Sequence, residues 1–223
     1  MVAVSDILEI EKYLDGVNAV IFDLDDTLYS EKQYVRSGYK AVAKLLGDEA
    51  LADRLWTYFE NGKPAIDELL NELGCMGRKE ECLEAYREQI PEIALYHGVS
   101  ELIQDLKSKG IKVGIITDGR VSGQKRKLQA LGLDKLIDDI IITDELGGTQ
   151  FRKPCDIAFR IVQRRWSIPF EQIVYVGDNA EKDFQAPKQL GMRTLYFENE
   201  DGLYFKGEIV GIETIKAVSE IAF

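Results

Sequence analysis

The sequence predicts an α/β fold, in which a Rossmann-like, mostly parallel sheet is flanked by helices and interrupted by an inserted helical unit. Two observations support this prediction. After about residue 95, short apolar runs alternate with helical segments, as in parallel strands that are joined by helical crossovers. Between about residues 30 and 96 no strand-like run occurs, and apolar residues recur at helical spacing instead.

Five apolar runs have the length of strands. They cover residues 19–22, 111–116, 140–142, 173–176 and 193–197. Helices are expected between them: one from Ser100 to Gly110, one that carries Leu128, and one over residues 156–166. Pro187 is expected to kink or restart the helix that follows the fourth run. The order of these elements predicts helices on both faces of the sheet.

The segment before the first run is expected to form a short amphipathic helix. Val4, Ile7, Leu8 and Tyr13 would make up its apolar face. Packing of this face on the core is the simpler interpretation, and an oligomer contact is the alternative.

The helical insert defines the predicted domain organisation. Glycines and Pro64 divide it into several helices, and leucines such as Leu45, Leu55 and Leu73 are expected in the core of a small bundle. The chain would then consist of a Rossmann-like core at residues 1–29 and 97–223 and a helical domain at residues 30–96.

Composition excludes several classes of partner. The chain has 223 residues, with 28 basic and 39 acidic side chains and a net charge of −11. Such a surface repels nucleic acid and anionic lipid. No apolar run is long enough to span a membrane, and the N-terminus lacks the layout of a secretory signal. We therefore expect a cytoplasmic protein with neither nucleic-acid nor membrane partners.

Cysteine and histidine usage argues against several kinds of site. The three cysteines, Cys75, Cys82 and Cys155, fit neither a disulfide framework nor a zinc site, so inert thiols are expected. A nucleophile that depends on histidine would have to use His97, the only one, which is expected in a loop.

The first apolar run leads directly into Asp23-Leu24-Asp25-Asp26-Thr27. Asp23 and Asp25 are two residues apart, so on extended backbone their side chains point the same way. Close like charges are costly unless a cation or a shared proton relieves them. The segment alone is equally compatible with a cation site and with an acidic turn in which Asp26 and Thr27 cap a helix.

Polar residues also follow the other predicted strands. Thr117 ends the second run, Asp178 and Asp183 follow the fourth, and Lys153 precedes a helix. The carboxyl ends of parallel strands meet at one edge of a sheet, where ligands bind. Carboxylates suit Mg²⁺, the free N–H groups from Asp118 onward can hold phosphate oxygens, and a lysine can offset the phosphate charge.

These residues, in this order, resemble the motifs of the haloacid dehalogenase-like hydrolases. The family's first motif, Asp-x-Asp-x-Thr after an apolar strand, is similar to residues 23–27, and its second, a Ser or Thr at a strand end, to Thr117. Its third, a lysine often followed by proline, is similar to Lys153, and its fourth, Gly-Asp followed by another acid, to Asp178 and Asp183. The resemblance covers about residues 19–197, and the helical insert resembles the family's first class of cap domain.

The resemblance implies a Mg²⁺-dependent phosphatase that hydrolyses a small phosphomonoester through an aspartyl-phosphate. Asp23 would be the nucleophile, and Asp25 would protonate the leaving alcohol and then deprotonate the attacking water. Asp23, Asp178 and the backbone carbonyl of Asp25 would bind the Mg²⁺. The acid at Asp25 implies phosphoryl chemistry, because the haloacid dehalogenases carry a non-acidic residue at that position.

The resemblance also implies the remaining roles. Thr117, Asp118 and Lys153 would bind the substrate phosphate, and Asp183 would support the waters of the metal or orient Lys153. Two departures from the family pattern stand out: Cys155 follows Lys153-Pro154 where many relatives carry Asp, and Asp118 stands where Asn is common. Neither removes a catalytic group.

Two other functions remain open from the sequence. One is a phosphomutase similar to β-phosphoglucomutase, which would need a cap that keeps water from the intermediate. The other is a non-catalytic phosphoryl-binding protein. In each case the expected partner is a small phosphorylated metabolite, and the chain is expected to be a monomer or a homodimer.

Overall fold

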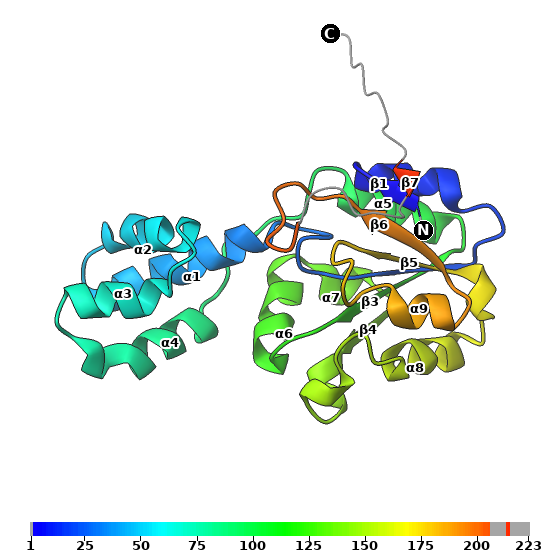
Figure 1. The fold of residues 1–223 in the computed structure, drawn as a ribbon. Coiled ribbons are helices and arrows are strands. Elements are labelled where there is room, and N and C mark those ends of the chain that lie inside the picture. Colours follow the sequence, from blue (N-terminus) through cyan, green and yellow to red (C-terminus); the bar gives the residue numbers. More distant parts are fainter. Residues whose placement is uncertain (1, 206–212, 215–223) are drawn as a thin grey trace, which may run out of the picture. The chain divides into compact units, whose positions relative to one another are not determined.

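A computed structural model of the chain describes residues 2–205 and the strand at residues 213–214 (Figure 1). Within these residues, seven strands form one sheet in the order β4-β3-β2-β5-β6-β1-β7, and every pair of neighbouring strands is parallel. The strands are β1 (Val2–Val4), β2 (Ala19–Phe22), β3 (Lys112–Thr117), β4 (Asp139–Ile142), β5 (Ile173–Gly177), β6 (Arg193–Phe197) and β7 (Glu213–Thr214).

Helices connect these strands. They are α5 (Val99–Ser108), α6 (Val121–Ala130), α7 (Leu133–Leu136), α8 (Ile157–Trp166) and α9 (Gln185–Gln189), with 3₁₀ turns η1 (Ile7–Tyr13), η3 (Thr143–Leu146), η4 (Thr149–Phe151) and η5 (Phe170–Gln172). Among the helices of the described residues, none combines the length and the apolar character needed to cross a bilayer.

Helices cover both faces of the sheet, as Figure 1 shows for α5 on one side and α8 and α9 on the other. Side chains of α8 and α9 share one buried cluster with alternate residues of β2 and β5. Gly114 of β3 faces α8 so closely that a Cβ there would lie 2.8 Å from the Trp166 ring. By alternation, Val113 and Ile115 point to the face that α5 covers. The prediction of an α/β fold with a mostly parallel, helix-flanked sheet is therefore confirmed.

The N-terminal segment differs from its prediction. Val4 does not belong to a helix but ends β1, which pairs with β6 and β7. The helical part is the 3₁₀ helix η1, and Asp6 caps its N-terminus. The side chain of Asp6 accepts a hydrogen bond from the backbone N–H of Leu8 at 2.9 Å. Ile7 and Ile10 of η1 are buried, whereas Leu8 is 38% exposed.

Pro187 lies near the start of its helix. It is the third residue of α9, which extends only from Gln185 to Gln189. A proline is tolerated in the first helical turn, because the N–H that it lacks would have no intrahelical acceptor there, but it is not tolerated further along. The chain therefore passes from β5 to β6 with a single short helix.

Residues 31–94 form a compact unit of their own, separate from the unit of residues 1–30 and 95–223. This second unit is described in full and contains helices but no strand: α1 (Glu31–Leu46), α2 (Leu51–Glu60), α3 (Ala65–Glu72), η2 (Met76–Arg78) and α4 (Lys79–Glu88). Its core includes Leu55, Leu69 and Cys82. Leu45 and Leu73 were expected in this core but lie at its surface, where they are 39% and 42% exposed.

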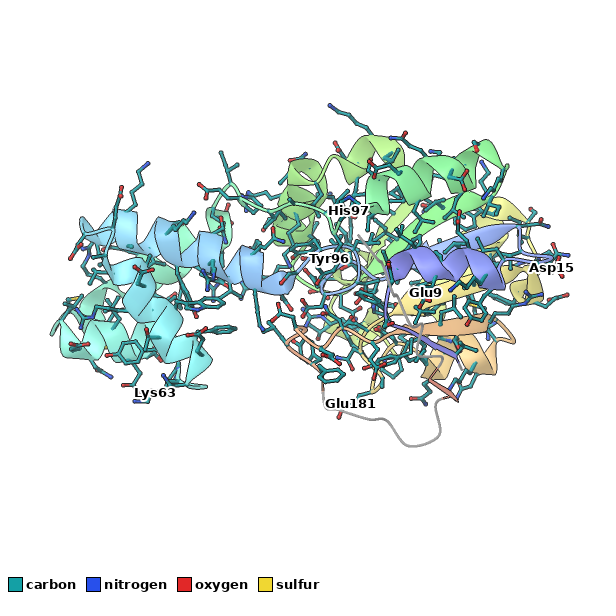
Figure 2. All side chains as sticks on the ribbon, turned by 90° about the horizontal axis from the view of Figure 1, so that it is seen from above. Glu9, Asp15, Lys63, Tyr96, His97 and Glu181 are labelled. Carbon is teal, nitrogen blue, oxygen red and sulfur yellow. The ribbon has the colours of Figure 1, made fainter. Side chains whose placement is uncertain are left out.

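The histidine and the cysteines are placed as follows. His97 lies in the turn ahead of α5 and is exposed (Figure 2). All three cysteines are free thiols, and Cys82 is buried in the helical unit. Burial raises the pKa of the Cys82 thiol, which disfavours its reactive thiolate form.

Candidate active site

The ends of three neighbouring strands, β3, β2 and β5, bring the first polar residues together. Phe22, the last residue of β2, is paired with Ile115 of β3 and Val176 of β5. Asp23 follows Phe22 directly, and its backbone N–H donates to the carbonyl of Val176 at 2.8 Å. Asp23 therefore lies between the strand that ends in Thr117 and the strand that leads to Asp178.

Lys153 joins two carboxylates in the interior. Its Nζ lies 2.7 Å from Oδ1 of Asp23 and 2.7 Å from Oδ1 of Asp183, and its side chain is fully buried. Lys153 also donates to the hydroxyl of Tyr175 at 2.9 Å, and this hydroxyl donates to Asp183 at 3.3 Å. Burial opposes the charge on Lys153, but Asp183 and Asp23 outweigh it and hold the pKa of Lys153 well above its ordinary value.

Asp183 is held by the backbone that precedes it. Its Oδ2 accepts a hydrogen bond from the N–H of Asn179 at 2.9 Å. A Cβ at Gly177 would lie 2.5 Å from the same oxygen, which is too close for any side chain. The end of β5 must therefore carry glycine for Asp183 to reach Lys153.

Three buried carboxylates form a cluster that can hold a metal ion. Asp23, Asp178 and Asp183 each offer one oxygen, and these oxygens lie within 4.8 Å of one another. Burial, with the charges of Asp23 and Asp183, raises the pKa of Asp178 to about 9. Burial also raises the pKa of Asp23, to about 6, although Lys153 acts in the opposite direction. Mg²⁺ prefers carboxylate oxygens as ligands, and the negative charge of these three carboxylates exceeds the positive charge of Lys153 beside them.

Thr27 supports this cluster instead of capping a helix. Its hydroxyl donates to Oδ1 of Asp178 at 3.1 Å. The helix that follows, α1, begins only at Glu31. The interpretation of Asp26 and Thr27 as helix caps is therefore wrong.

The side chain of Asp25 has a different environment from that of Asp23. Lys127 of α6 lies 2.7 Å from Oδ1 of Asp25, and Nε2 of Gln124 donates to Oδ2 at 2.8 Å. The hydroxyl of Tyr29 also donates to Oδ1. Burial alone would raise the pKa of Asp25, but the charge of Lys127 and these hydrogen bonds lower it. The carboxylate of Asp25 is not part of the cluster of Asp23, Asp178 and Asp183.

The backbone between Asp25 and Thr27 is tightly held. Asp26 has φ of 53°, in the left-handed region that non-glycine residues rarely adopt. Its carbonyl accepts from the side chain of Asn199 at 2.8 Å, and its carboxylate accepts from the N–H of Leu203 at 2.8 Å. The loop after β6 thus fixes the turn that carries Asp23 and Asp25.

Asp118 connects the loops around Lys153. Its Oδ1 accepts from the hydroxyl of Thr143 at 2.8 Å and from the backbone N–H of Lys153 at 3.1 Å. Lys182 lies 3.6 Å from the other oxygen. Because the carboxylate is engaged in this way, only the backbone N–H of Asp118 is suited to a phosphate.

Four residues whose side chains contact Asp25, Lys153 or Asp183 were missing from the sequence interpretation: Tyr29, Gln124, Lys127 and Tyr175. For two of them a signal was present. Gln124 lies four residues before Leu128, and Lys127 lies four residues before Leu131, so both polar residues share the buried face of α6 with these leucines. Buried polar side chains need polar partners. The two tyrosines gave no such signal, because apolar neighbours account for a buried aromatic ring.

The chain is similar in sequence to known enzymes. Residues 20–197 match the family model described as haloacid dehalogenase-like hydrolase. A glyceraldehyde 3-phosphate phosphatase of Methanocaldococcus jannaschii is 30% identical over 213 residues, which cover 84% of this chain and 90% of that protein. A ribulose-1,5-bisphosphate 5-phosphatase of Halopiger xanaduensis is 25% identical and covers 81% of this chain and 84% of its own length.

Solved structures share the fold. The HAD-hydrolase YfnB from Bacillus subtilis, bound to magnesium, has a TM-score of 0.62 and 20% identity over 87% of this chain and 90% of that one. CbbY from Rhodobacter sphaeroides, in complex with phosphate, has a TM-score of 0.56 and 22% identity over 89% of this chain and 92% of that one.

Proposed function

The chain belongs to the haloacid dehalogenase-like hydrolases as an enzyme that hydrolyses phosphate monoesters, and we propose that it does so with Mg²⁺ and through an aspartyl-phosphate on Asp23. One observation carries this proposal. The carboxylate of Asp23 lies at the buried end of β2, 2.7 Å from the ammonium of Lys153 and within the carboxylate cluster of Asp178. In this arrangement the carboxylate of Asp23 can act as the nucleophile, and the positive charge of Lys153 beside it can bind the substrate phosphate.

The first half of the reaction transfers the phosphoryl group to the enzyme. A carboxylate oxygen of Asp23 forms a bond to phosphorus, and the bond from phosphorus to the alcohol oxygen breaks. Asp25, in its acid form, gives its proton to that oxygen. The alcohol leaves, and Asp25 is left as a carboxylate.

The second half returns the enzyme to its starting state. Asp25 takes a proton from a water molecule as the water oxygen bonds to phosphorus. The bond between phosphorus and Asp23 breaks, and inorganic phosphate is released. The hydrogen bonds from Lys127, Gln124 and Tyr29 suit Asp25 to this step, because they stabilise the carboxylate form.

The other site residues act on the phosphoryl group or on its neighbours. Lys153, the hydroxyl of Thr117 and the N–H of Asp118 hold the phosphoryl oxygens, and Asp183 orients Lys153. The carboxylates of Asp23 and Asp178 and the carbonyl of Asp25 would hold Mg²⁺. When bound, this ion supplies the positive charge that screens the repulsion between a carboxylate and a phosphate.

The substrate class is proposed from the relatives. Those compared above act, by name, on glyceraldehyde 3-phosphate and ribulose 1,5-bisphosphate, which are small phosphorylated sugars. We therefore propose a small sugar phosphate as substrate, with glyceraldehyde 3-phosphate as the first to test. The helical unit of residues 31–94 is proposed as the cap domain of this family. A cytoplasmic location stays a prediction.

Replacement of the nucleophile tests the proposal. Asp23→Asn is expected to lower phosphate release from glyceraldehyde 3-phosphate and from 4-nitrophenyl phosphate by about 10³-fold or more. Wild-type enzyme quenched during turnover should contain phosphate that hydroxylamine releases, as an acyl phosphate does, and Asp23→Asn should contain none. The exposed acid Asp134, changed to Asn, is the matched control and should behave as wild type. Wild-type turnover by Asp23→Asn would contradict the mechanism.

A further inference from the structure

We infer that Gln124 and Lys127 of α6 are positioning residues for Asp25: together they fix the carboxyl group at the orientation in which it delivers a proton to the leaving oxygen. This inference rests on the proposed function, because it assumes that Asp25 is the acid of the phosphoryl transfer. It adds to the site two residues that lie outside the motif-like segments of the sequence.

The contacts restrain both oxygens of the carboxyl group from one helix. Lys127 Nζ lies 2.7 Å from Oδ1 of Asp25, and Gln124 Nε2 lies 2.8 Å from Oδ2. A carboxyl group that is held at both oxygens cannot rotate about its Cβ–Cγ bond without losing one of these contacts. Gln124 and Lys127 are three residues apart on α6, so a single rigid element presents both donors.

Burial makes these contacts costly to break. Gln124 is 3% exposed and Lys127 is 5% exposed, although glutamine and lysine normally lie at the surface. A lysine in the interior needs an anionic partner, and Asp25 supplies it. The pair is therefore built into the site, unlike Lys125 of the same helix, which forms an exposed ion pair with Glu145.

Gln124 also connects Asp25 to the residue proposed to hold the phosphate. Its Nε2 lies 2.5 Å from Oγ1 of Thr117, the last residue of β3. The amide group of Gln124 therefore links Asp25, the proposed proton donor, to Thr117, a proposed contact of the phosphoryl group, and restrains the distance between them. The leaving oxygen is bonded to that phosphorus, so the geometry of proton delivery depends on this link.

The role of a positioned acid differs between leaving groups. An alkoxide is a poor leaving group and needs a proton as its bond to phosphorus breaks, whereas 4-nitrophenolate leaves without one. The ratio kcat/KM covers the reaction up to release of the alcohol and does not include hydrolysis of the aspartyl-phosphate. Loss of the orientation of Asp25 should therefore lower kcat/KM for an alkyl phosphate much more than for an aryl phosphate. A residue that only stabilises the fold would lower both by the same factor.

The experiment uses Lys127→Met and Gln124→Met, which keep an unbranched side chain of similar length and remove the donors. For these variants we expect kcat/KM to fall about 100-fold with glyceraldehyde 3-phosphate and less than about threefold with 4-nitrophenyl phosphate. Lys127→Arg keeps a charged donor and should recover most of the loss. Lys125→Met and Gln129→Met, at exposed positions of the same helix, should leave both values unchanged.

Equal losses on the two substrates, in variants with a wild-type circular dichroism spectrum, would overturn the inference. If Lys127→Met does not fold, Gln124→Met, which exchanges one neutral side chain for another, decides the question alone. Asp25→Asn separates the two proposals, since it should show the same dependence on the leaving group. If Asp25→Asn shows that dependence and the α6 variants do not, only the inference fails. If Asp23→Asn turns over as wild type does, the proposed function fails.

Discussion

Gly177 shows, at the scale of a single residue, how the absence of a side chain can determine a site. Asp183 reaches Lys153 only because nothing projects from the end of β5 into its path. Lys153 in turn lies 2.7 Å from Asp23. The close approach of the Gly177 backbone to the Asp183 carboxylate thus helps to hold the ammonium group of Lys153 beside Asp23, the proposed nucleophile.

Gly177→Ala tests this dependence. The added Cβ would lie 2.5 Å from Oδ2 and 2.9 Å from Cγ of Asp183, so the carboxylate must move. We expect a loss of about 1–3 kcal/mol in the free energy of unfolding, measured by urea denaturation, together with a lower kcat/KM. Gly77→Ala is the control, because nothing lies within 4 Å of its added Cβ. Full activity of Gly177→Ala would show that Asp183 can hold Lys153 from another position.

Single residues also show where reasoning from the sequence stops. Asp23, Lys153, Asp178 and Asp183 could be chosen in advance, because strand order predicts which residues reach one edge of the sheet. Tyr175 could not, because its ring fits an apolar strand and its hydroxyl gains meaning only from partners that the fold supplies. The catalytic roles of the chosen residues stay predictions until they are tested.

At the scale of elements, the predictability of a strand depends on its burial. The central strands β2 and β5 are buried on both faces, so they read as continuous apolar runs. β1 has only three residues and pairs with strands that lie about 200 residues away in the chain. Its local sequence has no strand pattern, and the pairing with β6 decides its conformation.

The 3₁₀ helix η1 anchors the N-terminal segment to the core. Ile10 is fully buried, whereas Leu8, two residues before it, is 38% exposed. We expect Ile10→Ala to lower the free energy of unfolding by about 2–5 kcal/mol, and Leu8→Ala to lower it by less than about 1 kcal/mol. Urea denaturation followed by circular dichroism measures both. Similar losses in the two variants would mean that η1 does not pack through Ile10.

At the scale of the whole molecule, charge is distributed unevenly. The chain carries a net charge of −11, yet Lys127 and Lys153 are buried among the site carboxylates. An anionic substrate would be repelled by the overall charge and attracted by these lysines and by a bound cation. Mg²⁺ is therefore expected to affect the stability of the protein as well as its activity.

The expected stability effect follows from binding to the native state. At about 100 times its dissociation constant, Mg²⁺ should raise the free energy of unfolding by about 2.7 kcal/mol. Asp178→Asn should abolish this gain because it removes one carboxylate of the cluster, while Asp134→Asn, at an exposed position, should preserve it. Without metal, Asp178→Asn should be at least as stable as wild type, because burial and the neighbouring carboxylates raise the pKa of Asp178 to about 9 and folding at neutral pH must therefore protonate it, whereas asparagine is neutral already. Thermal denaturation with Mg²⁺ and with EDTA measures these differences, and an unchanged gain in Asp178→Asn would place the ion elsewhere.

The two compact units differ in a way that hydrogen exchange can test. The buried cluster around Leu55 contains only residues of the helical unit, so its packing free energy does not include the sheet. We expect Leu55→Ala to weaken this unit by about 2–5 kcal/mol and to speed amide exchange throughout α1 to α4. Leu45→Ala, at a position that is 39% exposed, should leave exchange there unchanged. If protection in β2 and β5 falls together with that in α1 to α4, the units unfold as one. If it does not, the helical unit opens without the sheet, and the residues proposed for catalysis stay in place while it does so.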